Sequence, residues 1–587
     1  MGDAAADLRS RAESAYADGD FEAAVEAWEE LHALMVERGD PRLAAEAAAM
    51  VAMYLMMDTG LMAPVRGWLR RADRLLAGVD DHPAHAVVAM VRTYERFMCG
   101  DMAAARVDST RAIELGERLG VVPAVVIGRT CAARLTIFEG RVDEGLALLD
   151  EVGALLMSGG ADPLTTGMMY CEIICAAQGL LLHDLAAEWT DVMERWRHGS
   201  AVGGIHGRCR VHRAEILRVT GTCEDAEQEA LAACEELRPW MRREFGWPLV
   251  ELGNIRLPPG DLEGAEEAFL AAHEHAWSPQ PGLALIRLAR GEVEEAATML
   301  ADAVERPDRI PSKERPPFGP LRLAPLLDAQ AEVAFAGIDR PTLERTAAEL
   351  RSVADAYRGP MLGSAALLAE ARLALLSGEP EEAATASAQA VAALADVGAP
   401  YETAKARLVL AQAHADAGRP DAARLERQSA RSTFVEYGAV LWAERVDREL
   451  VDDAPAPGGH EQRTPPATAT FSRQGDQRTV AWGDRSITLR DLKGLRHVER
   501  LLERPGVEQH ALDMMAVEER TGPDAPVRSP GILVLDDAAK AAYKRRLADI
   551  EDDLADARAC NDPARAELAE RDREYLVAEL RRAVGLG

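Results

Sequence analysis

Small and apolar residues recur along the first 450 positions at the spacing of one helix face. Leu8, Ala12 and Tyr16 share one face of a predicted first helix, and Trp28 and Leu31 continue the packing on a second helix. Residues four positions apart lie on the same side of an α-helix, so the pattern predicts two helices packed face to face. The same two-helix pattern is repeated along most of the chain.

Many of the predicted turns carry a glycine that stands five positions before an alanine. The glycine permits the left-handed turn that ends one helix, and the alanine lets the backbones of neighbouring helices approach closely. The pairs are Gly19/Ala24, Gly100/Ala105, Gly221/Ala226, Gly260/Ala265, Gly291/Ala296, Gly378/Ala383 and Gly418/Ala423. Turns of one kind follow each other at steps of about forty residues, which is the signature of a repeat protein.

These steps predict a mainly α fold: antiparallel helix pairs stacked into a tetratricopeptide-like α-solenoid, a right-handed superhelix with a long concave surface. The period is damaged at His183-Asp184-Leu185, where we expect a turn without its glycine. Residues 306–320 are rich in proline and charge, and no helix can run through them. We expect this break to separate an N-terminal solenoid over residues 1–305 from a second solenoid portion over residues 321–450.

Beyond residue 450 the pattern changes. Residues 451–470 have the composition of a linker. Residues 479–482 and 486–489 alternate as strands around Gly483-Asp484-Arg485, and a helix is expected over 491–503. We therefore predict a small α+β, winged-helix-like module over residues 471–530. Residues 531–587 are predicted to form an antiparallel helical hairpin, interrupted at Asn561-Asp562-Pro563.

The charge of the chain is unevenly distributed. The 587 residues include 67 basic and 98 acidic side chains, a net charge of −31. Residues 471–587 hold 20 basic and 23 acidic residues, which leaves 67 − 20 = 47 basic and 98 − 23 = 75 acidic residues before them. The acidity therefore belongs to the predicted solenoid, and this excludes nucleic-acid binding along its whole length.

Three features bear on the compartment. The N-terminus, Met1-Gly2-Asp3-Ala4, has neither the basic nor the apolar region of a secretory signal. The most apolar stretch, Ile173–Leu182, is about half as long as a membrane-spanning helix. The eight cysteines are scattered, as is typical of reduced thiols. We expect a soluble, cytoplasmic protein with no membrane segment.

Three segments carry a family resemblance: Tyr170–Cys175, Cys209–Leu217 and Ser278–Gly291. With them, residues 1–450 resemble the repeat region of MalT-like and LuxR-family transcriptional regulators, many of which are large ATP-binding proteins. In those regulators the repeats form a receiver arm for an effector or a partner. This chain lacks both the phosphate-binding G-x-x-x-x-G-K-[ST] loop of the ATPase and the LuxR helix-turn-helix. Its residues 471–587 instead resemble a segment that follows the repeats in some multidomain regulators.

The densest polar cluster of the predicted solenoid lies within the first two of these segments. Arginine presents a planar, bidentate donor that suits an anionic group, so the cluster is a candidate site for a partner or a small anionic effector. The alternative is an internal network of ion pairs between repeats, with Glu215 opposite Arg213. The residues are Tyr170, Glu172, Arg208, Arg210, His212, Arg213 and Glu215.

Four soft donor residues lie in the same region. Cys171 and Cys175 are four positions apart on one predicted helix, and Cys209 and His212 are three apart on another. If the two helices face each other, these side chains meet around a zinc ion. The alternative, which we favour, is that they are small buried residues of a tightly packed solenoid.

The winged-helix-like module carries a local excess of basic residues. Phosphate contacts by its arginines and lysine would suit a DNA-binding module, while an ordinary surface of mixed charge is the alternative. The candidates are Arg485, Arg490, Lys493, Arg496 and Arg500.

No catalytic motif of the common hydrolase, metalloprotease or dinucleotide-binding types occurs in the sequence, and we expect no cofactor. We therefore expect a non-enzymatic regulatory protein whose superhelix binds a protein, a peptide or a small effector. One alternative is a DNA-binding regulator that acts through the C-terminal module. Another is a metal-binding enzyme or accessory factor of a biosynthetic pathway. The terminal hairpin also offers a surface for homodimerisation.

Overall fold

The computed structural model describes residues 3–18, 20–198, 206–237, 244–307, 319–452, 469–474, 477–482 and 485–490. The chain divides into two compact units, a solenoid unit over Met1–Pro455 and a C-terminal unit over Ala456–Gly587. The first helices of the solenoid unit are α1 (Asp3–Ala17), α2 (Phe21–Glu37), α3 (Pro41–Asp58), α4 (Met62–Leu76), α5 (Pro83–Met98), α6 (Met102–Leu119), α7 (Val122–Phe138), α8 (Val142–Met157), α9 (Pro163–Gly179), α10 (His183–His198), α11 (His206–Thr220) and α12 (Cys223–Leu237).

The remaining helices of this unit are α13 (Gly246–Arg256), α14 (Leu262–Glu274), α15 (Gly282–Ala289), α16 (Val293–Glu305), α17 (Pro320–Ala336), α18 (Arg340–Tyr357), α19 (Pro360–Ser377), α20 (Pro380–Asp396), α21 (Pro400–Asp416), α22 (Pro420–Tyr437) and α23 (Val440–Asp452).

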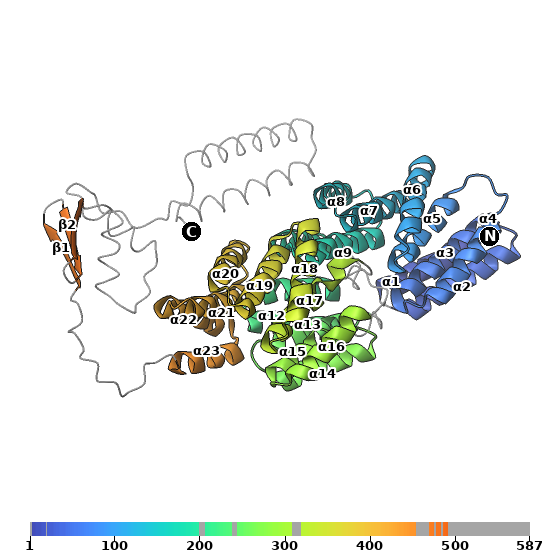
Figure 1. Ribbon diagram of the computed structural model, residues 1–587. Helices are drawn as coiled ribbons and strands as arrows, with labels where there is room; N and C mark the ends of the chain where they lie inside the picture. Colours follow the sequence, from blue (N-terminus) through green and yellow to red (C-terminus); the bar gives the residue numbers. More distant parts are fainter. Residues whose placement is uncertain are drawn as a thin grey trace. The chain divides into compact units, whose positions relative to one another are not determined.

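The helices are stacked in chain order. Each helix packs against the next one, and odd-numbered helices also pack against one another, as in the series α3, α5, α7, α9 and the series α17, α19, α21. The connecting turns are short, so successive helices run antiparallel. Figure 1 shows these pairs following one another from α1 to α23. The predicted mainly α solenoid of helix pairs is therefore confirmed.

The turns have the backbone that the glycine pattern predicted. Gly60, Gly100 and Gly140 have φ of +63°, +74° and +83°, in the left-handed region that glycine adopts without a steric penalty. The alanine of every predicted pair is at most 1% exposed, because it faces the neighbouring helix. Gly19 lies outside the described residues.

Among the described residues, four turns have a residue other than glycine at the left-handed position: Leu181, Ala276, Ile338 and Arg358. Two of them bear on the predicted repeat pattern. Between α9 and α10 it is Leu181, and between α17 and α18 it is Ile338, each with φ of +57°. The first is the turn that the sequence predicted to be damaged at His183. The second was expected near Gly337, which stands one position too early. A non-glycine residue in this conformation costs about 1 kcal/mol or more, so its surroundings must hold it there.

The helix stack continues across the proline-rich segment. Residues 308–318 lie outside the described part of the chain, but the helices on either side of them share one apolar cluster, in which Leu300 of α16 meets Val333 of α17. Residues before and after the segment belong to the same compact unit.

Helices far apart in the sequence also come together. The Tyr357 hydroxyl donates a hydrogen bond to the carbonyl oxygen of Phe138 at 3.2 Å. The Tyr437 hydroxyl donates a hydrogen bond to the carbonyl oxygen of Arg218. Each of these two bonds joins residues 219 positions apart. We call these two bonds the closure contacts. They bring the last helices of the solenoid, α18 and α22, against α7 and α11.

The described part of the C-terminal unit is a three-stranded antiparallel sheet in the order β1 (Ala469–Gln474), β2 (Gln477–Trp482), β3 (Arg485–Arg490). Trp482 pairs with Arg485, so the two predicted strands form an antiparallel hairpin; Gly483 and Asp484 between them lie outside the described residues. Strand β1 was not predicted, since its first residues were assigned to the linker. The helix expected over 491–503 and the hairpin expected over 531–587 lie outside the described residues.

One helix among the described residues, α19, is long and apolar enough to cross a membrane, with a mean hydropathy of 1.2 over 18 residues. A core helix of a soluble protein has the same composition. Helix α19 packs against α17, α18, α20 and α21, and Leu362, Ala366 and Ala369 belong to the main core cluster.

Close packing at the helical glycines gives a stability test. A Cβ at Gly153 of α8 would lie 2.0 Å from the ring of Trp189, whereas a Cβ at Gly67 of α4 would meet nothing within 4 Å. We expect Gly153→Ala to cost about 1–3 kcal/mol through overpacking. The matched control Gly67→Ala should gain about 0.5–1 kcal/mol from its higher helix propensity. Thermal midpoints of the two variants measure this, and a Gly153→Ala midpoint at or above that of Gly67→Ala would contradict the packing.

Candidate functional site

The arginines of the predicted polar cluster are held in ion pairs. Arg208 makes two hydrogen bonds to Glu244, at 2.6 and 2.7 Å, and both side chains are buried. Arg210 contacts Glu236 at 2.6 Å and Glu229 at 2.9 Å. These contacts join α11 to α12 and to the turn before α13.

Arg213 of α11 pairs with Glu194 of α10 and lies 3.9 Å from Glu229. Its expected partner Glu215 instead lines the central cavity described below. Tyr170 is 1% exposed and packs against Trp189 and Trp196. The described contacts therefore form a network between repeats, and its buried members Tyr170, Glu172, Arg208 and His212 are not on a surface that a ligand can reach.

Glu172 takes part in a second buried network. Its two carboxylate oxygens accept hydrogen bonds from the Tyr94 hydroxyl and from the Arg134 guanidinium, and all three side chains are buried. The guanidinium also lies over the ring of Phe97, 5.0 Å from its centroid. Burial and the neighbouring Glu172 charge raise the pKa of Tyr94 well above its usual value, so this phenol stays a donor. The network locks α5, α7 and α9 together.

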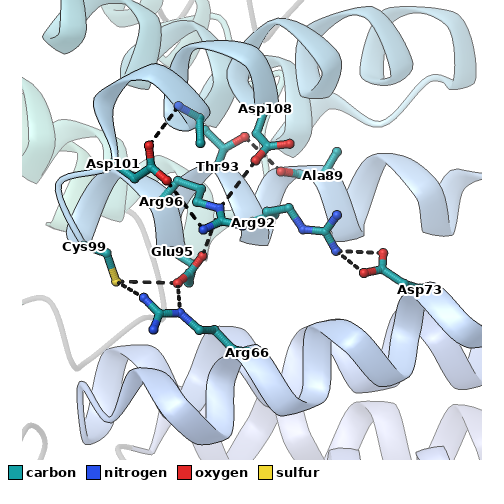
Figure 2. A network of polar contacts seen from close by, with 11 residues as sticks. Arg66, Asp73, Ala89, Arg92, Thr93, Glu95, Arg96, Cys99, Asp101 and Asp108 are labelled. Atoms are coloured by element: carbon teal, nitrogen blue, oxygen red, sulfur yellow. Dashed lines mark hydrogen bonds and ion pairs between the residues drawn. The ribbon is translucent and has the colours of Figure 1, made fainter.

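A comparable network closes the turn between α5 and α6 (Figure 2). Its centre is Glu95, which is 1% exposed and accepts a 2.6 Å hydrogen bond from Arg66 of α4. Arg66 also reaches the sulfur of Cys99 at 3.1 Å, and Arg96 lies 3.6 Å from Asp101 at the start of α6. Burial, and then the charge of Glu95, raise the pKa of the Cys99 thiol.

Three of the four predicted metal donors meet. Donor atoms of Cys171 and Cys175 on α9 and of His212 on α11 all lie within 4.8 Å of one another. Cys209 is also buried but is not part of this group. A thiol beside an imidazole also suggests a nucleophile, but Cys171 and His212 are both 0% exposed, so no substrate can reach them in this structure. Soft-metal binding is the chemistry that this arrangement fits.

The solenoid unit contains a partly open cavity of about 1040 Å³. Its wall runs from Gln178 of α9 to Glu449 of α23, so it is built from the helices that the closure contacts bring together. Both Arg218 and Tyr437, which form one closure contact, lie in this wall. Much of the lining is apolar, with Leu326, Leu408 and Trp442 among its members.

A lysine and a glutamate form a charge pair inside this cavity. Lys405 Nζ lies 2.9 Å from Glu332 Oε2 and 5.5 Å from the ring centroid of Trp442. Burial disfavours the charged form of Glu332, but Lys405 and then Arg372 outweigh it and lower the pKa of Glu332 to about 2. The pair is ionised at neutral pH and gives the apolar wall a polar centre.

Two further groups in the wall are incompletely satisfied among the described residues. Arg372 Nη1 is buried without a hydrogen bond, and its nearest carboxylate oxygen, on Asp328, is 3.9 Å away. His183 Nδ1 is likewise buried without a partner. Burial, and then the nearby charge of Arg218, lower the pKa of His183 to about 4. Buried polar groups are usually satisfied, so these two mark the wall as a place where a ligand gains hydrogen bonds.

Sequence reasoning missed this cavity because its wall is assembled from distant repeats. One signal was available. The chain uses arginine almost throughout, and Lys405 is the single lysine between residues 314 and 492. The lysine ammonium is a compact, strongly hydrated point charge that differs from the planar guanidinium, so a lone lysine in an arginine-rich segment is a distinctive position.

The predicted DNA-contacting residues are only partly described. Arg485 and Arg490 are the first and last residues of β3, and the structure describes their backbone alone. Lys493, Arg496 and Arg500 lie outside the described residues. DNA binding through this module stays a prediction.

The chain is similar to solved helical structures only at low sequence identity. No family model and no curated protein matches it. It is similar to the crystal structure of the APC/C hetero-tetramer Cut9–Hcn1, with 12% identity and a TM-score of 0.32 over 75% of this chain and 95% of that one. It is also similar to yeast Tom70, with 11% identity and a TM-score of 0.29 over 77% of this chain and 97% of that one. Values this low carry no argument about function, and the likeness to MalT-like and LuxR-family regulators stays a resemblance.

The Glu172 network gives a second stability test. Glu172→Gln leaves the buried Arg134 guanidinium without its counter-charge, so we expect a loss of about 3–5 kcal/mol in the free energy of unfolding. The matched control is Glu117→Gln, which breaks the exposed pair with Arg129 and should change stability by less than about 0.5 kcal/mol. Urea unfolding measures both. The double variant Arg134→Met/Glu172→Leu should recover most of the loss, and equal effects of Glu172→Gln and Glu117→Gln would contradict a buried ion pair.

His183 makes stability depend on pH. Its pKa is about 4 in the folded protein and about 6.5 in the unfolded chain, so between these values only the unfolded state takes up a proton. Stability should therefore fall by roughly 3 kcal/mol as the pH drops from 6.5 to 4. His183→Gln should flatten the dependence of the urea midpoint on pH between 7 and 5. Protonation of Glu332 destabilises the fold only at lower pH, below 4.5, the ordinary pKa of a glutamate. If the urea midpoint of His183→Gln still falls with pH between 7 and 5 as steeply as that of the wild type, the assignment to His183 is wrong.

Proposed function

We propose that this protein is a non-enzymatic interaction protein whose solenoid binds an extended peptide segment of a partner protein inside the central cavity. The cavity between α9 and α23 is the observation that carries the proposal. Stacked helix pairs create concave surfaces of this kind, and rigid walls reduce the entropy lost on binding.

The cavity is large enough for a short peptide segment. Sites for single drug-sized ligands enclose about 300–1,000 Å³, and this cavity reaches about 1040 Å³. Its apolar walls suit the side chains of an extended segment. Arg372 and His183 offer a donor and a ring nitrogen that peptide groups can satisfy.

The charge of the lining favours a peptide of mixed character. Seven carboxylates and seven basic side chains face the cavity, so no single sign dominates. A small anionic effector would need a surplus of basic groups. The carboxylates are Glu215, Glu251, Asp302, Asp328, Glu332, Glu402 and Glu449, and the basic residues are Arg218, Arg306, Arg322, Arg372, Lys405, Arg445 and Arg448.

The setting is proposed to be transcriptional regulation in the cytoplasm. Support for this comes from the resemblance of Tyr170–Cys175, Cys209–Leu217 and Ser278–Gly291 to MalT-like and LuxR-family repeat regions. When a receiver arm changes conformation on binding a partner, another part of the protein has to transmit that change. The C-terminal unit is the part of the chain available for that step.

Blocking the cavity tests the proposal. A display library of random twelve-residue peptides is panned against the full-length protein, and the selected peptides are measured by fluorescence polarisation. Leu326 is partly exposed in the cavity wall, so Leu326→Trp should place an indole in the cavity and weaken peptide binding at least tenfold. The matched control Leu270→Trp lies on α14 at a position that is 51% exposed and outside the lining.

The control should bind like the wild type. If no peptide is selected, or if Leu270→Trp weakens binding as much as Leu326→Trp does, the cavity is not the binding site. Circular dichroism of both variants checks that the solenoid is intact.

A further inference from the structure

Two cysteines and a histidine meet inside the solenoid with the spacing of metal ligands. The sulfurs of Cys171 and Cys175 are 4.0 Å apart, and Cys171 Sγ lies 3.1 Å from His212 Nε2. Zinc binds sulfur at about 2.3 Å and nitrogen at about 2.0 Å, so the donors of a tetrahedral zinc site are about 3.5–3.8 Å apart. The donor atoms of Cys175 and His212 lie within 4.8 Å of each other. Side-chain shifts of about 1 Å or less bring the three donors to that geometry.

A glutamine orients the histidine for this role. His212 Nδ1 lies 2.5 Å from Gln178 Oε1, and Gln178 Nε2 donates a hydrogen bond to the His212 carbonyl oxygen at 3.3 Å. The second bond fixes which end of the amide faces the ring, because a carbonyl accepts only from the nitrogen. Nδ1 therefore carries the proton, and the lone pair of Nε2 points toward the sulfurs. Metal-binding histidines are oriented by a partner in this way.

The donor chemistry selects the ion. The group contains two thiols and an imidazole and no carboxylate, a set that suits zinc and not magnesium or calcium. Two thiolates and a neutral imidazole balance the charge of one Zn²⁺. A neutral complex can be buried without an uncompensated charge, and these three residues are at most 1% exposed. We propose that Cys171, Cys175 and His212 form a zinc site that joins α9 to α11 and leaves the fourth position of the tetrahedron to a ligand from outside the group.

The site lies directly behind the cavity wall. Gln178 lines the cavity, and so does Trp247, whose ring packs edge-on against His212 with the centroids 4.8 Å apart. A bound ion would fix both wall residues through His212. Cys209 stands one helical turn before His212 but outside the donor group, so the site rests on three protein ligands.

Metal content and spectroscopy of the full-length protein test the site. The purified protein, loaded with Zn²⁺ and desalted, should retain about one equivalent by elemental analysis. Loading with Co²⁺ should give the near-ultraviolet charge-transfer band of thiolate ligation and the visible bands of tetrahedral cobalt. This second readout needs no variant, so it stands even where a substitution in the core prevents folding.

Variants assign the ligands. Cys175→Ser and His212→Gln should lower the retained zinc at least tenfold, and Gln178→Leu should weaken zinc affinity by about 10–100-fold. Cys131→Ser, a buried cysteine of α7 outside the group, is the matched control and should keep its zinc. Retention below a tenth of an equivalent with no cobalt charge-transfer band would overturn the proposal, as would equal loss of zinc in Cys131→Ser.

Discussion

The closure contacts are the constraint on which the arrangement of the solenoid depends. A stack of helix pairs is held together by neighbours alone, and nothing in that local packing encloses a space. Here the hydroxyls of Tyr357 and Tyr437 bond to backbone carbonyls of Phe138 and Arg218, each 219 positions away. Helices α18 and α22 are thereby held against α7 and α11. The cavity exists because these distant helices meet, and its wall contains residues from both sides.

Most of the fold was predictable because it rests on local chemistry. A left-handed turn favours glycine, and a close helix crossing favours alanine. Gly100 and Ala105, only five positions apart, were therefore enough to predict the turn and the helix contact that follows it. The closure contacts gave no such signal, since a tyrosine that meets a carbonyl five repeats away looks like any core tyrosine. The partners of Arg208 and Arg213 were equally hidden. Arg208 pairs with Glu244 in the turn before α13 and Arg213 pairs with Glu194 of α10, at sequence distances that the local pattern does not fix.

The buried ion pairs fix the alignment of neighbouring helices more than they stabilise the fold. Hydrophobic contacts between alanine-rich helices allow several alignments along the helix axis, because one small residue packs much like another. A buried pair such as Arg134 and Glu172 tolerates only one alignment, since any slip leaves two desolvated charges alone. The same reasoning applies to Lys405 and Glu332, which lie on α21 and α17 and therefore align two odd-numbered helices. A solenoid that must place distant walls opposite each other needs alignment of this kind.

The irregular turn after α9 shows where local and distant demands conflict. Leu181 adopts the strained left-handed conformation that glycine adopts at most of the described turns. The neighbouring Leu180 carbonyl oxygen packs against the turn between α18 and α19, where a Cβ at Gly359 would lie only 3.0 Å from it. Leu181 and His183 also line the cavity. A glycine at position 181 would relieve the strain but would remove an apolar side chain from the wall. The irregular turn therefore combines two roles: it contacts the turn between α18 and α19, and it supplies Leu181 and His183 to the cavity wall.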